Sequence, residues 1–181
     1  MKTETSQNKI FNALKAELGY TNPMQTPRVE KVVVSSGVGK IKDQKRRDFI
    51  AERLARITGQ RAAPRGAKKA VANFKSRVGD VVGFQVTLRG KYGESFLQKL
   101  IHIVLPRVKD FRGIKPDSID EMGNITIGLK EHTVFPETSD EDSKDVFGLA
   151  VTIATTAKNK KEAAAFLRHL GLPLREAEVN K

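Results

Sequence analysis

The sequence predicts an α+β protein, in which helices cover one face of a mainly antiparallel sheet and the other face stays open. Two observations support this fold class. The predicted elements run αβα, then two or more strands, then αββα. Consecutive strands with no helix between them favour antiparallel pairing. Three of the predicted strands alternate apolar residues with small or polar ones, which is typical of a sheet that is covered on one side only.

Four helices are predicted from apolar residues at three- and four-residue spacing. They span residues 6–18, 43–58, about 93–105 and about 160–170. Gly19 and Gly59 follow the first two helices and are expected to end them, because glycine readily adopts the left-handed conformation of a C-cap. Pro106 is expected to end the third helix. Asn159 is predicted to cap the fourth helix at its N-terminus.

Besides the extended residues 60–72, strands are predicted over residues 28–36, 81–89, 124–130 and 147–155. The second strand alternates most clearly: the open side would carry Gly83, Gln85, Thr87 and Arg89. Residues 60–72 are basic and predicted to be extended, residues 73–80 read as an exposed turn, and residues 136–145 form a predicted acidic loop.

Length and composition restrict the class of protein. The 181 residues suit one domain over residues 1–175, and we expect residues 176–181 to be a disordered tail. The absence of cysteine excludes disulfides, thiol nucleophiles and thiolate metal sites. The chain has neither an apolar run of roughly 18 residues, as a membrane helix requires, nor the apolar segment of a secretory signal. We therefore expect a cytoplasmic protein.

The positive charge is concentrated in one third of the chain. The sequence has 33 Lys and Arg against 21 Asp and Glu, a net charge of +12. Between Lys40 and Lys91 there are 15 basic and 4 acidic residues, whereas the rest of the chain is almost balanced. A concentrated basic block predicts a surface that neutralises phosphates. A solvated helix face is the alternative for Lys45, Arg46 and Arg53, but it accounts less well for the basic residues beyond residue 60.

No motif indicates an enzyme, a cofactor or a metal. Gly37-Val38-Gly39 resembles the start of a dinucleotide fingerprint, but Lys42 stands where the third glycine is required. A tight strand exit with unusual backbone angles, or a contact of backbone N–H groups with RNA phosphates, remains open for this turn. His102, His132 and His169 lack the spacing of a metal site and read as structural or solvated residues.

Two places favour contact with nucleic acid. In the turn around residues 73–79, Phe74 is followed by the cations Lys75 and Arg77, which suits a phosphate backbone and a stacked base. The alternative is an ordinary hairpin connection with Phe74 in the core. The open sheet face carries hydrogen-bonding residues where RRM-type sheets carry aromatic ones, and this favours recognition of a folded RNA through backbone, 2′-hydroxyl and base edges.

In order along the chain, the motifs VEKVVVSSGVG (29–39), ITGQR (57–61), AKKAVANFKSRVG (67–79), VTLRG (86–90) and LPRVKDFRG (105–113) are followed by GNITIGLKE (123–131), VFPE (134–137), VTIATTA (151–157) and LRHLGLP (167–173). With these motifs, the chain resembles the bacterial type of the large-subunit ribosomal protein five family, which binds 5S rRNA. The resemblance covers residues 8–175 and implies an RRM/ferredoxin-like topology.

The resemblance implies a structural role in the central protuberance of the large subunit. The implied partners are 5S rRNA, 23S rRNA, P-site tRNA, neighbouring proteins of the 5S ribonucleoprotein and a small-subunit head protein across an intersubunit bridge; no membrane is implied. Ser35, Gln60 and Thr87 correspond to family positions that contact 5S rRNA. To these we add, as expected 5S contacts, Arg61, Arg65, Lys68, Lys69, Gln85 and Arg89. The tRNA-facing loop would contain Asn73, Phe74, Lys75, Ser76 and Arg77.

One position departs from the family. Ser35 stands where the family usually has Asn, and serine lacks the reach and bidentate geometry of an amide. Two alternatives remain open from the residues alone. One is a free-standing basic RNA-binding regulator or chaperone, and the other is an enzyme that holds a nucleotide at the Gly37–Gly39 turn.

Overall fold

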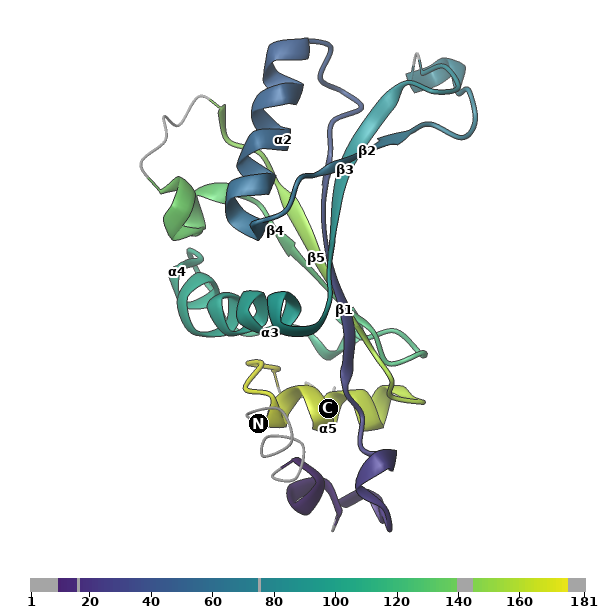
Figure 1. Cartoon of the computed structure of the whole chain (residues 1–181), viewed down its shortest axis with the longest axis vertical. Helices are drawn as coiled ribbons and strands as arrows, with labels where there is room; N and C mark the ends of the chain where they lie inside the picture. The colour runs from purple at the N-terminus through teal and green to yellow at the C-terminus, as the bar shows by residue number, and fades with distance from the viewer. Residues whose placement is uncertain (1–9, 16, 75, 140–144, 176–181) are drawn as a thin grey trace, which may run out of the picture. The chain divides into compact units, whose positions relative to one another are not determined.

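The computed structural model describes residues 10–15, 17–74, 76–139 and 145–175 (Figure 1). The predicted tail at 176–181 lies outside these residues, as does Lys75. The described part has the predicted α+β arrangement, and its sheet has five strands. Its strands are β1 (Val29–Gly37), β2 (Ala63–Gly66), β3 (Val81–Leu88), β4 (Ile125–Leu129) and β5 (Leu149–Thr155).

The strand order in the sheet is β2-β3-β1-β5-β4. β3 is antiparallel to both β1 and β2. β5 also runs antiparallel to β1, because Arg28 bonds to Thr156 at one end while Ser36 bonds to Gly148 at the other. Helices α2 (Gln44–Thr58) and α3 (Gly90–Lys99) complete a βαββαβ series in chain order. This series has the ferredoxin-like strand order, and β4 is an added edge strand.

The chain forms two compact units. One contains residues 10–31, 110–127 and 152–175 of the described chain, and the other contains residues 32–109 and 128–151. β1, β4 and β5 each contribute residues to both units. The whole basic block between Lys40 and Lys91 falls in the second unit.

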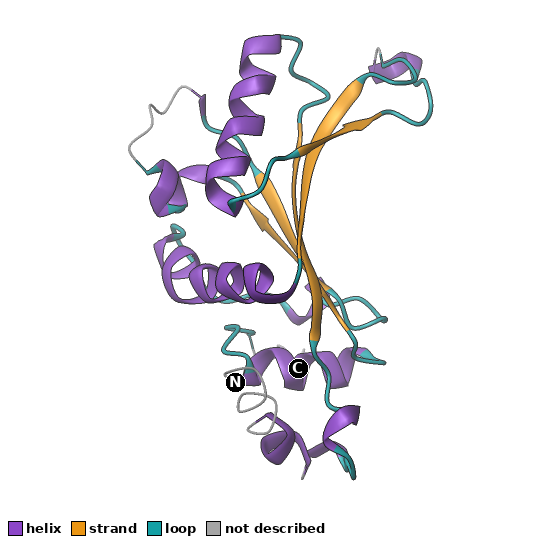
Figure 2. Cartoon of the chain, in the orientation of Figure 1, coloured by secondary structure: helices purple, strands orange, loops and turns teal. Residues whose placement is uncertain are grey.

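In the second unit, α2 and α3 cover one face of the sheet (Figure 2). The core beneath them combines residues of all three elements. It contains Val32, Val34, Val86 and Leu88 from the strands, Ile50, Leu54 and Ile57 from α2, and Phe96 and Leu97 from α3. α2 begins at the N-cap Asp43, whose side chain accepts from the N–H of Lys45, and ends at the left-handed Gly59. The covered face and the helix ends therefore agree with the sequence pattern.

The third predicted helix begins earlier and ends later than expected. α3 starts at Gly90 and continues through a π-helical turn (Leu100–Val104) into α4 (Leu105–Arg107), so Pro106 lies inside the last turn. The N–H of Leu105 donates to the carbonyl of Leu100 across this wide turn. A proline ring normally clashes with the carbonyl four residues earlier, and the π turn widens the helix immediately before Pro106.

Three other expectations need correction. β3 ends at Leu88, and Arg89 is the N-cap of α3. Only part of the predicted acidic loop is loop, because Pro136–Thr138 forms a 3₁₀ turn (η6) and residues 140–144 lie outside the described residues. Gly37 and Gly39 do not have positive φ angles, so they are not needed there for unusual backbone conformation.

The first unit is built around α5 (Lys160–His169), whose N-cap Asn159 accepts from the N–H of Glu162 as predicted. Residues 10–15 and 17–18 are helical. The hydroxyl of Tyr20 donates to the carboxylate of Glu162, which is itself buried. Burial and this hydrogen bond raise the pKa of Tyr20 above its usual range.

Candidate nucleic-acid interface

The face of β1 and β3 that the helices leave uncovered brings together three predicted RNA-contacting residues. In the antiparallel register, Val33 pairs with Thr87, Ser35 with Gln85, and Gly37 with Gly83. All six residues alternate with the buried set and are half-buried or exposed. The hydroxyls of Ser35 and Thr87 and the amide of Gln85 therefore lie on one continuous surface.

Arg65 joins this surface from the neighbouring strand. β2 pairs with β3 so that Ala63 is opposite Gln85 and Arg65 is opposite Gly83. The guanidinium Nε of Arg65 donates to the side-chain oxygen of Gln85 at 2.7 Å. A register shift between Arg65 and Gly66 follows directly, and such bulges commonly redirect side chains.

Beyond β2, the chain continues into an irregular two-stranded arm that carries the next basic residues. The backbone of Ala67 bonds to Asp80 and Gly79, and the backbone of Val71 bonds to Ser76 in both directions. Lys68 and Lys69 lie in a bend between these pairings and are exposed. Figure 1 shows the hairpin of β2 and β3, which carries this arm at its end, projecting away from α2.

The predicted turn lies at the tip of this arm. Asn73 and the backbone of Phe74 belong to a 3₁₀ turn (Ala72–Phe74), and Ser76 is half-buried. Arg77 is exposed, and its backbone N–H donates to the Asp80 carboxylate at 2.7 Å. The side chain of Asp80 thus holds the tip backbone, and Arg77 is exposed beside it.

Three predicted residues lie outside the paired strands. Gln60 and Arg61 follow α2 and are exposed, while the Gln60 backbone is held by the Thr58 hydroxyl. Arg89 is exposed at the start of α3. These residues belong to the same compact unit as the open face; within the described residues, no hydrogen bond or ion pair links them to Ser35, Gln85 or Thr87.

The basic residues of the arm differ from those of α2 in their partners. On α2, Glu52 pairs with Arg53 at 3.3 Å and Arg56 at 2.9 Å, and Arg46 lies 4.0 Å from Asp145. In the part of the chain that is described, no carboxylate pairs with the side chains of Lys68, Lys69 or Arg77 in the arm, or with that of Arg61 before β2. The alternative of a solvated, ion-paired helix face therefore fits α2, and the arm carries the uncompensated charge.

The structure offers little for other kinds of chemistry. No group of three or more His, Asp or Glu residues suited to a metal ion occurs among the described residues. His132 is fully buried and stacks on Phe147 at 4.1 Å, so it is a core residue, while His102 and His169 are exposed. In the described chain, no helix combines the length and hydrophobicity needed to span a membrane.

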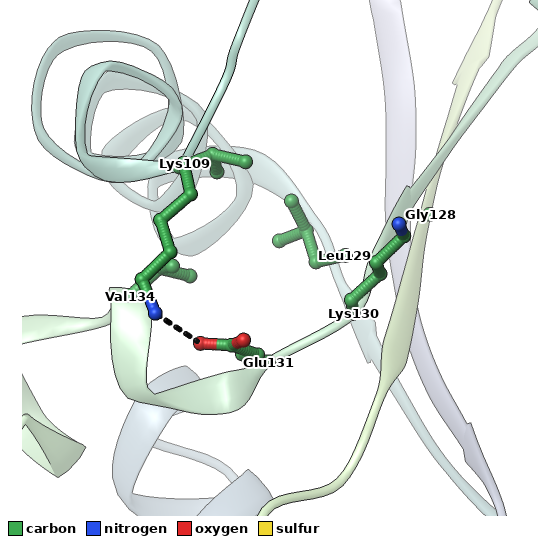
Figure 3. Close-up of a pocket in the computed structure, with 7 residues that line it drawn as sticks. Lys109, Gly128, Leu129, Lys130, Glu131 and Val134 are labelled. Carbon is green, nitrogen blue, oxygen red and sulfur yellow. Dashed lines mark ion pairs between the residues drawn. The ribbon is translucent and has the colours of Figure 1, made fainter.

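One shallow pocket is present in the second unit (Figure 3). It is lined by Val108, Lys109, Gly128, Leu129, Lys130, Glu131 and Val134, and Lys109 faces Glu131 across it at 4.0 Å. None of the predicted RNA-contacting residues lines this pocket. The candidate interface is the sheet face and its basic arm.

Sequence reasoning placed Gly83 on the open side of its strand and Gly37 at a possible RNA-contacting turn, but it did not bring the two glycines together. Gly37 and Gly83 face each other across β1 and β3 and leave bare backbone on the open face. Glycine within a strand commonly marks a close approach of another backbone, so their strand positions were the available signal. Only the structure shows the register between β1 and β3 that places Gly37 opposite Gly83.

Comparison with known proteins gives a consistent result along nearly the whole chain. Residues 22–77 match the family model described as Ribosomal protein L5, and residues 81–174 match the model for the C-terminus of the same ribosomal family. The large ribosomal subunit protein uL5 of Anaeromyxobacter sp. (strain K) is 46% identical over 174 residues, covering 96% of this chain and 97% of the relative. The uL5 protein of Rubrobacter xylanophilus is 46% identical, over 93% of this chain and 94% of the relative. That of Natranaerobius thermophilus is 48% identical, over 94% of this chain and 96% of the relative.

Proposed function

Because this chain belongs to the ribosomal protein L5 family, we propose that it binds 5S rRNA through the open face of β1 and β3. It is a structural, non-enzymatic constituent of the large ribosomal subunit and is located in the cytoplasm. Family membership thus sets aside the nucleotide-dependent enzyme and the free-standing regulator.

One observation carries the proposal: Ser35, Gln85 and Thr87 lie side by side on an uncovered sheet face, in the same unit as the basic arm, whose exposed Lys68, Lys69 and Arg77 have no carboxylate partner among the described residues. Hydroxyl and amide groups can bond to 2′-hydroxyls and base edges, and these contacts distinguish one folded RNA from another. The cations of the arm supply attraction for phosphates without regard to sequence. The combination suits recognition of one particular RNA.

The other partners are part of the same proposal. Anchoring of 5S to 23S rRNA, contact of the arm tip with P-site tRNA, and a bridge to a small-subunit head protein follow from the family resemblance. The exposure of Arg77 at the end of the arm supports the tRNA contact. Gln60, Arg61, Lys68, Lys69 and Arg89 are proposed as further rRNA contacts.

A Thr87→Val substitution tests the proposed face. We expect the affinity for 5S rRNA to fall roughly three- to tenfold, the loss of one neutral hydrogen bond. The salt dependence of binding should stay unchanged, because no phosphate-contacting charge is removed. A filter-binding titration at several salt concentrations measures both quantities. An unchanged affinity would remove Thr87 from the site.

A further inference from the structure

We infer that Arg65 is a positioning residue, which orients the amide of Gln85 so that its NH2 group faces the RNA. This inference rests on the proposed function and specifies which kind of RNA atom the open face recognises. The two side chains come from neighbouring strands, and Nε of Arg65 lies 2.7 Å from the side-chain oxygen of Gln85. Gln85 would then recognise a hydrogen-bond acceptor of the RNA.

The orientation of the amide follows from the chemistry of its partner. A guanidinium carries only donors, so the atom of Gln85 that faces Nε must be the oxygen. The NH2 group of Gln85 consequently points elsewhere, and no acceptor among the described residues bonds to it. A free amide on a surface would rotate among several orientations, and the bond to Arg65 selects one of them.

The surroundings leave this NH2 group accessible. Ala63 and Ser35 are the cross-strand neighbours of Gln85, and both are small. Gly83, opposite Arg65, has no side chain. The bond from Arg65 to Gln85 uses Nε, and within the described residues no acceptor bonds to the terminal nitrogens of Arg65.

The pair therefore presents N–H groups toward an RNA ligand. Phosphate oxygens, 2′-hydroxyl oxygens and base carbonyl or ring-nitrogen atoms accept such bonds, whereas base amino groups do not. Arg65 contributes more than charge in this arrangement, because its planar geometry holds Gln85 in place. Lysine would keep the charge but lacks the planar fork of donors.

A double-mutant cycle with Arg65→Lys and Gln85→Met tests the inference. The charge is constant throughout the cycle, so counterion release is too. We expect Arg65→Lys to weaken 5S rRNA binding roughly three- to tenfold in the wild-type background, within the range of coupled neighbours. In the Gln85→Met background the same change should have little effect, because there is no amide to orient.

Arg107→Lys is the matched control, since Arg107 is exposed in the same unit, has no ion-pair partner among the described residues and is not one of the proposed RNA contacts. It should leave the affinity nearly unchanged in both backgrounds. Thermal unfolding of each variant is measured to check that it is folded.

Additive effects of Arg65→Lys and Gln85→Met would overturn the positioning role, as would wild-type affinity for Arg65→Lys. Each variant is titrated with 5S rRNA and with an unrelated folded RNA of equal length. Equal wild-type binding to both RNAs would refute the proposed function itself, and the positioning role in 5S recognition with it. A 5S preference combined with an additive cycle would refute only the positioning role.

Discussion

At the scale of single residues, Gly37 and Gly83 leave bare backbone on the open face, and we expect this to let a ligand approach closely. An ideal Cβ at Gly83 would lie 3.1 Å from the carbonyl oxygen of Ser36, so a side chain at this position would disturb the sheet. A Cβ at Gly37 would meet nothing within 4 Å and would project into open space. Gly37 is therefore free of a packing requirement, and the account gives it a role in ligand approach.

Substitution of Gly37 by Ala tests this role. The strand should tolerate or slightly favour alanine, because glycine weakens a strand interior. Affinity for 5S rRNA should nevertheless fall roughly tenfold, which corresponds to about 1.4 kcal/mol. Titration with 5S rRNA measures the loss.

Gly128→Ala in β4 is the matched control for this substitution. Gly128 is also an exposed strand glycine with open space at its Cβ position and an ordinary φ angle, but it lies away from Ser35, Gln85 and Thr87 in the strand order. Its substitution should leave 5S binding unchanged. Equal effects of the two substitutions would contradict a specific close approach at Gly37.

The sequence predicts which residues share the open side of β3, because side chains alternate strictly along a strand. It cannot predict the register between strands that are distant in the chain, and the pairing of Ser35 with Gln85 depends on that register. The bond from Arg65 to Gln85 needs the register of β2 as well. Strand β2, which contains Pro64 and two small residues, carries too weak an apolar pattern to predict this register.

At the scale of elements, Lys99 joins α3 to the end of α2. Its ammonium donates to the carbonyl of Ile57 at 2.7 Å and pairs with Glu137 of η6. It also lies over the rings of Phe96 and Phe135, at 5.6 and 5.9 Å from their centroids. The side chain of Lys99 is 22% exposed, so water only partly screens these interactions.

We predict that Lys99→Met destabilises the protein by about 1–2 kcal/mol, since hydrogen bonds to charged groups are worth somewhat more than neutral ones. Methionine keeps the apolar contact and so limits the loss of packing. Lys109→Met is the control, because Lys109 is 86% exposed and its ion pair spans 4.0 Å. Urea unfolding of both variants provides the comparison, and equal stability would contradict a structural role of Lys99.

The arm tip provides a second prediction at this scale. Replacing Lys75 and Arg77 by Ala should leave the 5S rRNA affinity and its salt slope at their wild-type values. The reason is that the arm separates the tip from the open face that carries Ser35 and Thr87. Binding of P-site tRNA to ribosomes assembled with this variant should weaken. A parallel loss of 5S affinity, with a salt slope reduced by about two, would mean that the tip also contacts 5S phosphates.

The helices show which features of an element the sequence can predict. The apolar spacing and the predicted caps Gly59 and Asn159 agree with the structure, because each depends on local chemistry. The third helix passes through Pro106 because of the preceding π turn, and no local pattern predicts that turn.

At the scale of the whole molecule, the net charge of +12 is unevenly divided between the two units. Nearly all of the excess lies between Lys40 and Lys91, within the unit that also contains the open polar face. Charge alone would attract any RNA, with an affinity that falls steeply as salt rises. The central claim is that the hydrogen-bonding face adds a preference for 5S rRNA to this general attraction.

The most direct test of this claim is a gel shift of the full chain with 5S rRNA and with an equal-length unrelated folded RNA, each at two salt concentrations. The account predicts tight binding of 5S rRNA at both salt concentrations, together with loss of the control RNA at the higher one, because hydrogen-bonded contacts are less sensitive to salt than phosphate contacts. Equal binding of both RNAs, lost together as salt rises, would contradict it. The basic block would then act as a general phosphate-binding surface.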